Sequence, residues 1–304
     1  MYVKESNCIS VVIPLYNNYQ TIERAVFSVL SQSYSNWELI IVDDGSEDEG
    51  LSLIEKMNDS RIRCYRLPHQ NANVARNYGI AHSNGRYIAM LDADDEWTEN
   101  HLACSMDILQ KENADGIYGS LILRGKIDRL VATRVLQQDE SWIDFLLSNG
   151  YAAQTSTLFM TSVSVKAILW DETLLRHQDY DFVVRYCRKY RMSPKMEATT
   201  IYYSSQEPKI IDFKSCIRFI KSVEDEISDH VYMNYHLQML HLAVTRLADE
   251  AVVQYYRKAA TRCEYLLSLS DYLVLREPQS KANALKLKMR YLWNVFRTPI
   301  SIQI

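Results

Sequence analysis

Three aspartates directly follow an apolar run in the first third of the chain. The run Tyr87–Leu91 reads YIAML and follows a turn signal, so it predicts a short strand with Asp92, Asp94 and Asp95 at the rim of a sheet. Carboxylates packed this closely repel one another and are costly to bury unpaired, so the cluster suits water or a bound cation. Asp92 and Asp94 are therefore candidate oxygen ligands for Mg²⁺ or Mn²⁺, which share their remaining positions with substrate phosphates. The alternative is a solvated acidic turn in which Asp95 or Thr98 caps the next helix.

A second pair of acids precedes an apolar helical face. Asp179 and Asp181 lie in or just before the predicted first turn of this helix. The positive end of a helix favours an ionised carboxylate, so an aspartate there is a ready proton acceptor. Asp181 can also pair with Arg185, four residues later. The alternative is that either acid only caps the helix. The apolar residues that share the helical face are Phe182, Val183, Tyr186, Cys187 and Tyr190.

The segment His69–Gly79 begins with polar residues and continues as a predicted helix through Ala81. Backbone N–H groups at a helix start attract anions, and Arg76, one turn in, adds a forked set of donors that suits phosphate or carboxylate. The alternative is an exposed surface helix, because isolated Arg and Asn side chains are mostly solvated.

The N-terminal elements predict a sheet edge where these residues can meet. Ile9–Leu15 is an apolar run typical of a buried strand, a helix is predicted from about Thr21 to Gln32, and Trp37–Val42 is a second strand. A strand, helix and strand with short connections form a right-handed unit of a parallel sheet. Ligands of such sheets bind beyond the carboxyl ends of the strands, where the loop after Pro14 and the acids Asp43-Asp44 both fall.

The rest of the chain predicts further alternation and then helices. From Ile210 onward the pattern is helical. Before that point, the predicted helices are 51–57, 97–111 and a short one after Asp139, and the predicted strands are 62–67, 117–123, 127–132 and 156–160.

The stretch 281–297 carries lysines and arginines but no acids, interleaved with apolar residues such as Trp293 and Phe296. Such a basic amphipathic segment suits an anionic membrane surface. The alternative is a helix packed on the catalytic domain with its lysines in water.

Composition is that of an ordinary folded protein. The 304 residues are 47% hydrophobic and 24% charged, and the formal charge of −4 gives no bias toward nucleic acid, so no nucleic-acid partner is expected. The six cysteines are scattered, without a C-x-x-C pair or zinc-finger histidine spacing, which favours reduced thiols. No apolar signal sequence and no run of ~18 apolar residues is seen. We therefore expect a cytoplasmic protein.

Taken together, these segments resemble the inverting family 2 glycosyltransferases, whose nucleotide-sugar domain has the glycosyltransferase A-type fold. The resemblance implies an α/β catalytic domain with a central, mostly parallel sheet over residues 1–208, followed by a C-terminal helical region over 209–304. The five matching segments, in the family's order, are Val11–Asn17, Ile40–Ser46, Ala75–Gly79, Leu91–Asp95 and Asp179–Phe182.

The resemblance also implies a role for each matched residue. Asp44 would contact the nucleobase, with the loop that contains Tyr16 beside it, and Arg76 would lie near the diphosphate. Asp92 would lie near the ribose and the metal, and Asp94 would hold the metal. The full set implied to bind the nucleotide sugar is Pro14, Tyr16, Asn17, Asp44, Arg76, Asp92 and Asp94.

Asp179 matches the residue taken as the catalytic base in the family, and Asp181 remains the other candidate. The sequence departs from the family in two places. Gln178 stands where an acid is usual, which weakens the assignment of the base. Asn71 stands where glycine is common, a mild change because asparagine tolerates positive φ.

The implied activity is transfer of a sugar from a nucleotide-diphosphate sugar, with UDP as the expected nucleotide, to a sugar hydroxyl, using Mn²⁺ or Mg²⁺. The implied acceptor is a glycan or a lipid-linked sugar in the assembly of bacterial surface polysaccharide or lipopolysaccharide, at the inner face of the membrane. An oligomer is compatible with the many apolar residues of the C-terminal helices.

Two other functional classes remain open. A sugar nucleotidyltransferase would share the sheet and the metal, but the chain lacks the glycine-rich phosphate loop expected near the N-terminus of such an enzyme. A non-catalytic nucleotide-sugar-binding protein would not need both acidic groups.

Overall fold

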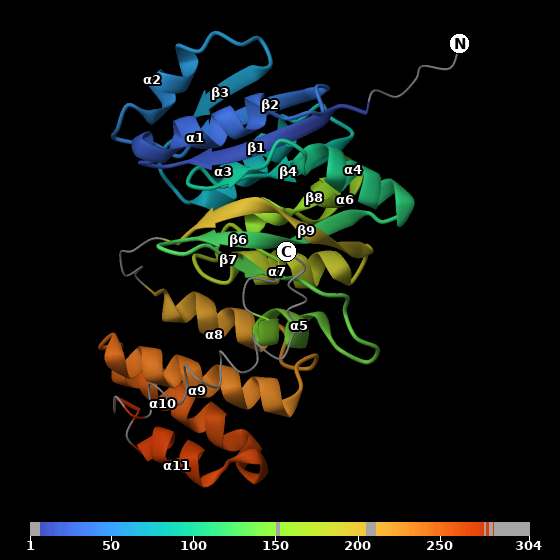
Figure 1. Ribbon diagram of the computed structural model, residues 1–304. Coiled ribbons are helices and arrows are strands. Elements are labelled where there is room, and N and C mark those ends of the chain that lie inside the picture. Colours follow the sequence, from blue (N-terminus) through green and yellow to red (C-terminus); the bar gives the residue numbers. More distant parts are fainter. Residues whose placement is uncertain (1–6, 150–152, 205–210, 277, 280–281, 283–304) are drawn as a thin grey trace. The chain divides into compact units, whose positions relative to one another are not determined.

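The computed structural model describes residues 7–149, 153–204, 211–276, 278–279 and 282 (Figure 1). The chain divides into two compact units. The first contains the described residues of Met1–Val135 and Tyr151–Lys209, and the second those of Leu136–Gly150 and Ile210–Ile304. Every residue implied above to bind or react lies in the first unit. The boundary at 208/209 stays a prediction.

The first unit is built on one mixed sheet with the strand order β3-β2-β1-β4-β8-β6-β9-β5, and β7 pairs with β6. β1 is parallel to β2 and β4, and β2 is parallel to β3, as the N-terminal pattern predicts. The strands are β1 (Ile9–Leu15), β2 (Trp37–Asp43), β3 (Ile62–Arg66), β4 (Tyr87–Met90), β5 (Glu96–Trp97), β6 (Gly116–Arg124), β7 (Arg129–Val131), β8 (Phe159–Thr161) and β9 (Met192–Tyr203).

Helices cover both faces of the parallel part of this sheet. The apolar residues of α1 face the sheet at the spacing that the sequence shows. On the other face, α3 packs Ala75 against Ile40 and Val42 of β2. The helices of the first unit are α1 (Tyr19–Leu30), α2 (Gly50–Glu55), α3 (Ala72–Ala81), α4 (His101–Lys111), η1 (Thr155–Thr157), α6 (Ser162–Ile168) and α7 (Gln178–Cys187).

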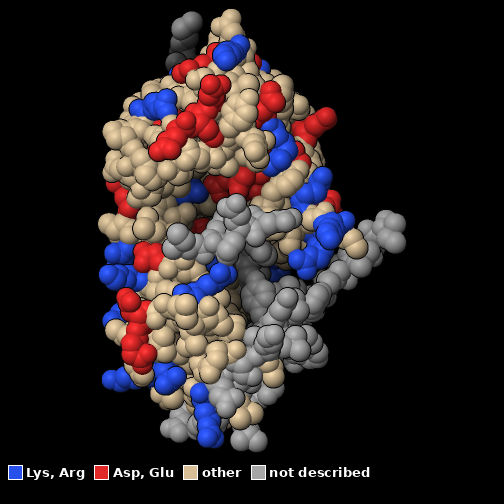
Figure 2. All heavy atoms as spheres, turned by 90° about the vertical axis from the view of Figure 1, so that its left-hand side faces the viewer, with Lys and Arg blue, Asp and Glu red and all other residues tan. Residues whose placement is uncertain are grey.

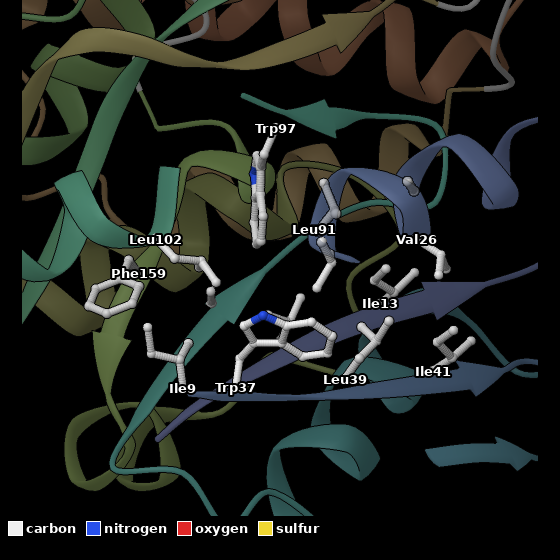
Figure 3. Close-up of a cluster of buried hydrophobic side chains, with 14 of the residues drawn as sticks. Ile9, Ile13, Val26, Trp37, Leu39, Ile41, Leu91, Trp97, Leu102 and Phe159 are labelled. Carbon is white, nitrogen blue, oxygen red and sulfur yellow. The ribbon is translucent and has the colours of Figure 1, made fainter. Parts of the chain in front are cut away.

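A large hydrophobic core of the first unit lies on the α1 side of the sheet (Figure 3). Ile9 and Ile13 of β1, Trp37 of β2, Leu102 of α4 and Phe159 of β8 all point into it and are almost completely buried. Burial of large apolar side chains is the dominant favourable term in folding. This core therefore holds the strands whose carboxyl ends carry the candidate site.

Three predicted elements differ from the structure. Thr155–Thr157 form a 3-10 turn, so the predicted strand 156–160 is wrong in its first half and β8 begins at Phe159. Trp97 is not helical, because it lies in β5, pairs with Thr200 of β9 and donates its Nε1–H to the Ser156 carbonyl at 2.8 Å. The helix α4 begins only at His101. The predicted strand 127–132 is only Arg129–Val131, because residues 125–128 form the turn of the hairpin.

The second unit is helical, as the pattern after Ile210 predicts. Its helices are α5 (Trp142–Asn149), α8 (Phe213–Ser222), α9 (Asp229–Thr245), α10 (Glu250–Ala260), η2 (Thr261–Leu266) and α11 (Leu269–Arg276). Among the described residues, no helix is long and apolar enough to cross a membrane. The basic stretch 281–297 lies, apart from Ala282, outside the described residues.

Candidate active site

The carboxyl ends of β1, β2 and β4 meet at one edge of the sheet, and a pocket of about 150 Å³ opens there. One face of the molecule is visibly hollowed, with carboxylates at the floor of the hollow (Figure 2). The residues that line the pocket at the carboxyl edge are Pro14, Leu15, Tyr16, Asn18, Asp44, Ala72, Arg76, Asp92, Ala93 and Asp94. The structure thus brings together six of the seven residues proposed to bind the nucleotide sugar.

Asn17, the seventh, supports the pocket from outside it. Its φ of 49° is left-handed, its N–H donates to Ser46 Oγ at 2.9 Å, and its Oδ1 accepts from the Glu47 N–H at 2.8 Å. Asparagine tolerates this backbone conformation better than most residues. Asn17 therefore ties the loop after β1 to the loop after β2.

The three aspartates after β4 form a tight turn in which the Asp95 N–H donates to the Asp92 carbonyl at 3.1 Å. Asp95 is fully buried and does not cap α4. Its Oδ1 accepts from the Tyr203 N–H at 3.1 Å, and its Oδ2 accepts from Ser156 Oγ at 2.5 Å. The third acid is therefore an anchor, which holds the turn so that Asp92 and Asp94 stay half-exposed in the pocket.

Burial, together with the charges of Asp92 and Asp94, raises the pKa of Asp95 well above its ordinary value. The hydrogen bonds from Ser156 and Tyr203 act in the opposite direction but do not outweigh burial. The raised pKa favours the protonated form of Asp95, and a neutral carboxyl at this position lowers the repulsion inside the turn.

Ser156 is the centre of the network behind this turn, a role that no local sequence pattern indicates. Its Oγ accepts from the Asp92 N–H at 3.1 Å and donates to Asp95. Its carbonyl accepts from Trp97 Nε1 at 2.8 Å and from Thr200 Oγ1 at 3.1 Å. One residue of η1 thereby fixes both ends of the acidic turn.

Arg76 on α3 is buried, not on an exposed surface helix. Its Nη1 donates to Asn73 Oδ1 at 3.0 Å and its Nη2 to Asp92 Oδ1 at 2.8 Å, and the guanidinium lies over the Trp170 ring at 4.7 Å. Its Nε is buried without a hydrogen-bond partner among the described residues. A positively charged guanidinium in the pocket wall suits an anionic ligand.

Asn73 and Asn77, on the same helix, fasten the segment that leads to α7. Asn73 Nδ2 donates to the Leu174 carbonyl at 2.9 Å, and Asn77 exchanges two hydrogen bonds with the Trp170 backbone at 2.8 and 2.9 Å. Asn71 caps the helix with φ of −173°, its Oδ1 accepting from the Asn73 N–H at 2.9 Å. The positive φ considered for Asn71 is therefore not required.

Asp179 lies in the first turn of α7, as predicted, and is half-buried. Burial raises the pKa of its carboxyl, although the Tyr180 N–H and the positive charges of Arg76 and Arg176 oppose this shift. Burial thus opposes the stabilisation of the ionised carboxylate that is expected at a helix start.

Asp181 is already engaged. It is buried and its Oδ2 accepts from Arg185 Nε at 2.8 Å, in the i, i+4 pair that the sequence predicts. Arg185 also donates to the carbonyls of Ile168 and Leu169, both at 3.0 Å. This ion pair fixes α7 against the end of α6, so Asp181 is the less available of the two acids.

Asp44, after β2, is almost fully buried. Its Oδ1 accepts from the Gln70 N–H at 2.9 Å, and its Oδ2 lies 2.9 Å from His69 Nδ1. The His69 ring in turn stacks on Tyr16, with centroids 4.1 Å apart. Asp44 therefore closes the pocket at the end opposite the acidic turn, beside a flat aromatic surface.

The acidic turn fits a divalent cation only in part. Among the described residues, no group of three or more His, Cys, Asp or Glu side chains could hold a metal by itself. Mg²⁺, however, is usually bound by one or two carboxylates together with substrate phosphates. Asp92 and Asp94, with Arg76 beside them, match that shared type of site.

Comparison with known proteins identifies the family of this chain. The sequence model "Glycosyl transferase family 2" matches residues 10–160. The putative colanic acid biosynthesis glycosyl transferase WcaA of Escherichia coli (strain K12) is 30% identical over 203 residues, which are 65% of this chain and 72% of WcaA. The UDP-Glc:alpha-D-GlcNAc-diphosphoundecaprenol beta-1,3-glucosyltransferase WfgD of Escherichia coli is 37% identical over 176 residues, 58% of this chain and 64% of WfgD. The chain thus spans less than two thirds of the length of WfgD.

Solved structures share the fold. TarS residues 1–349 of S. aureus, in complex with UDP-GlcNAc, gives a TM-score of 0.67 at 14% identity, covering 94% of this chain and 89% of that one. The mannosyltransferase PcManGT from Pyrobaculum calidifontis, in complex with GDP-Man and Mn²⁺, gives 0.56 at 15% identity, covering 94% and 85%. The chain therefore has the glycosyltransferase A-type α/β fold that its motifs imply, and it belongs to glycosyl transferase family 2.

Proposed function

We propose that this protein transfers a sugar from a nucleotide-diphosphate sugar, UDP-linked, to a hydroxyl of a glycan or lipid-linked acceptor, with inversion at the anomeric carbon. The observation that carries the proposal is the buried Arg76 in the pocket wall, which pairs with Asp92 beside Asp94. A site of this kind, with one fixed cation and two half-exposed carboxylates, suits a diphosphate together with a divalent metal.

The donor would lie along the pocket from Asp44 to Asp94. The nucleobase would stack near Tyr16 and contact Asp44. In the structure, the His69 ring stacks on Tyr16 and lies against the Asp44 carboxylate. The diphosphate would reach Arg76. Asp92 and Asp94 would hold Mn²⁺ or Mg²⁺, which when bound supplies positive charge to offset the negative charge that develops on the leaving diphosphate.

The chain's own base is proposed to be Asp179. It takes the proton from the attacking hydroxyl on the face of the sugar opposite the leaving diphosphate, and a single displacement then inverts the anomeric carbon. Asp181 is a poorer candidate because Arg185 holds its carboxylate. The raised pKa of Asp179 makes it a stronger proton acceptor once ionised, so burial favours this role.

The setting is proposed to be polysaccharide or lipopolysaccharide assembly on the cytoplasmic side of the membrane. This rests on the relatives, one of which is named for a diphosphoundecaprenol-linked acceptor. The basic stretch 281–297, which apart from Ala282 lies outside the described residues, remains a proposed peripheral membrane contact.

A panel of sugar nucleotides with Mn²⁺, followed by release of free nucleoside diphosphate, tests the proposal. One UDP-sugar should be turned over faster than the others, and Asp94→Asn should remove this activity. Formation of pyrophosphate from a sugar 1-phosphate and a nucleoside triphosphate would point instead to a nucleotidyltransferase. Tight nucleotide-sugar binding without turnover, in the presence of candidate acceptors, would indicate a binding protein.

A further inference from the structure

The β6–β7 hairpin carries an exposed apolar and basic tip that the catalytic account does not use. Ile127 is 82% exposed and Leu130 is 54% exposed, although both are large apolar side chains. Lys126 and Arg129 are exposed beside them, and the only acid of the turn, Asp128, is paired with Arg124 at 3.1 Å. The tip is therefore both apolar and positively charged.

The hairpin lies at the same edge of the sheet as the candidate site. β8 is antiparallel to β4 and β6 is antiparallel to β8, so β6 runs in the direction of β4. The end of β6 at Arg124 therefore falls at the edge where β4 leads into Asp92.

Direct contacts support this placement. The guanidinium of Arg124, at the base of the hairpin, lies over the Tyr203 ring at 5.8 Å, and the Tyr203 N–H donates to Asp95. Arg24 lies over the same ring at 3.7 Å and donates to the Asp94 carbonyl. The base of the hairpin is thus joined to the acidic turn through one aromatic residue, while its tip extends beyond the edge.

We propose that the tip of the β6–β7 hairpin, residues 126–130, contacts an anionic lipid bilayer surface when the enzyme works on a membrane-bound acceptor. The inference rests on the proposed function for the acceptor class. Ile127 and Leu130 enter the headgroup region, and Lys126 and Arg129 meet the lipid phosphates. Cations near such a surface and apolar side chains in the interface contribute together to reversible binding.

The chemistry favours a bilayer over a soluble anionic glycan. A soluble glycan would use the two cations but gains little from bare isoleucine and leucine side chains, which lose hydrophobic free energy while they stay in water. A bilayer accommodates both kinds of residue. The position at the site-bearing edge would orient the pocket toward the surface that holds a lipid-linked acceptor.

Sedimentation with vesicles of phosphatidylethanolamine and phosphatidylglycerol, at low salt, tests this with the full chain. The wild-type protein should bind these vesicles and should bind pure phosphatidylcholine vesicles more weakly. Lys126→Gln combined with Arg129→Gln should weaken partitioning by about 25-fold, from about fivefold per cation. Ile127→Ser combined with Leu130→Ser should weaken it on both kinds of vesicle, because the apolar contribution does not depend on lipid charge.

Matched changes elsewhere serve as controls. Val163, which is 79% exposed on α6, and the exposed pair Arg188 and Lys189 after α7 offer the same chemistry away from the hairpin. Val163→Ser and the double change Arg188→Gln, Lys189→Gln should bind vesicles like the wild type. All hairpin variants should release nucleoside diphosphate from the donor in water at the wild-type rate, so a failure of the proposed catalytic function would show separately.

Three results would overturn the inference. The first is a wild-type protein that ignores anionic vesicles, and the second is a set of hairpin variants that bind as tightly as the wild type, which would move any membrane contact elsewhere in the chain. The third is binding that a soluble acidic polysaccharide abolishes at equal charge concentration while Ile127→Ser has no effect. That pattern would identify the tip as a glycan contact.

Discussion

Two pairs of aspartates stand at the same edge of the sheet, and the protein covers their carboxylates to different extents. Asp43 and Asp44, at the end of β2, are 0% and 2% exposed in their side chains and are held by protein partners. The side chain of Asp92, after β4, is 21% exposed and pairs with Arg76 at 2.8 Å. Both pairs follow an apolar strand, so the difference in exposure lies in the residues that surround them.

The surroundings explain the difference. After β2, Arg66 pairs with Asp43 at 3.0 Å, and Ser46 donates to the same carboxylate. After β4, the stabilising contacts fall on Asp95, which leaves the first two acids of the turn directed into the pocket. Asp92 and Asp94 can thus face a ligand because Asp95 makes the contacts that hold the turn.

The largest expected effect is that of Asp94→Asn. An amide cannot supply the charge that holds a divalent metal, so transfer should fall by about 10⁴-fold while the fold persists. Turnover with Mn²⁺ and circular dichroism of the variant measure the two quantities. Unchanged turnover with unchanged metal dependence would make the acidic turn as structural as Asp43.

Asp179→Asn should lower turnover by about 10³-fold with donor affinity nearly unchanged, since it removes a base and not a donor contact. A loss confined to donor affinity would indicate a binding role, and near-normal turnover would move the base to Asp181.

The raised pKa of Asp179 also predicts the form of the pH profile. Because only the ionised carboxylate accepts a proton, kcat/KM should rise with pH through a midpoint above the ordinary value of about 3.9. The folded state holds this proton more tightly than the unfolded chain, so the carboxyl contributes less stability as pH rises through that interval. Denaturant unfolding of wild type and Asp179→Asn across acid pH measures this effect. As pH rises through the interval, the free energy of unfolding of the wild type should fall relative to that of the variant. Equal slopes would contradict the raised pKa.

Ser156→Ala should have an intermediate effect. Without its hydroxyl, the Asp92 N–H and the Asp95 carboxyl lose a shared partner, so metal affinity should fall by about 10–100-fold, as for other residues that orient ligands. Mn²⁺ titration in the presence of UDP gives this value directly. Ser156→Thr keeps a hydroxyl and should recover part of the affinity. If the alanine and threonine variants lose metal affinity alike, the hydroxyl does not position the turn.

The smallest effect on catalysis is expected from Asp43→Asn. It weakens the pair with Arg66 and the contacts to Ser46, and should lower the free energy of unfolding by about 1–2 kcal/mol. The folded fraction should retain its kcat, as measured with saturating donor. A loss of kcat comparable to that of Asp94→Asn would remove the contrast between the two pairs.

Local sequence patterns predicted the parallel strands and the residues at their ends. Period and turn signals predict Ile9–Leu15 as it is observed and Trp37–Val42 one residue short of the observed strand, and the acids follow from their position after those strands. Contacts distant in sequence were not predictable in this way. Ser156 meets Asp95 across 61 residues, and Asn77 meets Trp170 across 93. A run of neighbouring residues carries no signal of such a pairing. Local patterns therefore predict a strand where Ser156 forms a short turn.

We propose that Asp92, Asp94 and Arg76 receive a metal-bound diphosphate. Calorimetric titration of UDP into the wild-type protein, with and without Mn²⁺, tests this most directly. We expect Mn²⁺ to tighten UDP binding by at least about tenfold, a gain of about 1.4 kcal/mol. This gain should be absent in Asp94→Asn and present in Asp43→Asn. UDP binding that is equally tight without metal, or a gain that survives in Asp94→Asn, would contradict the claim.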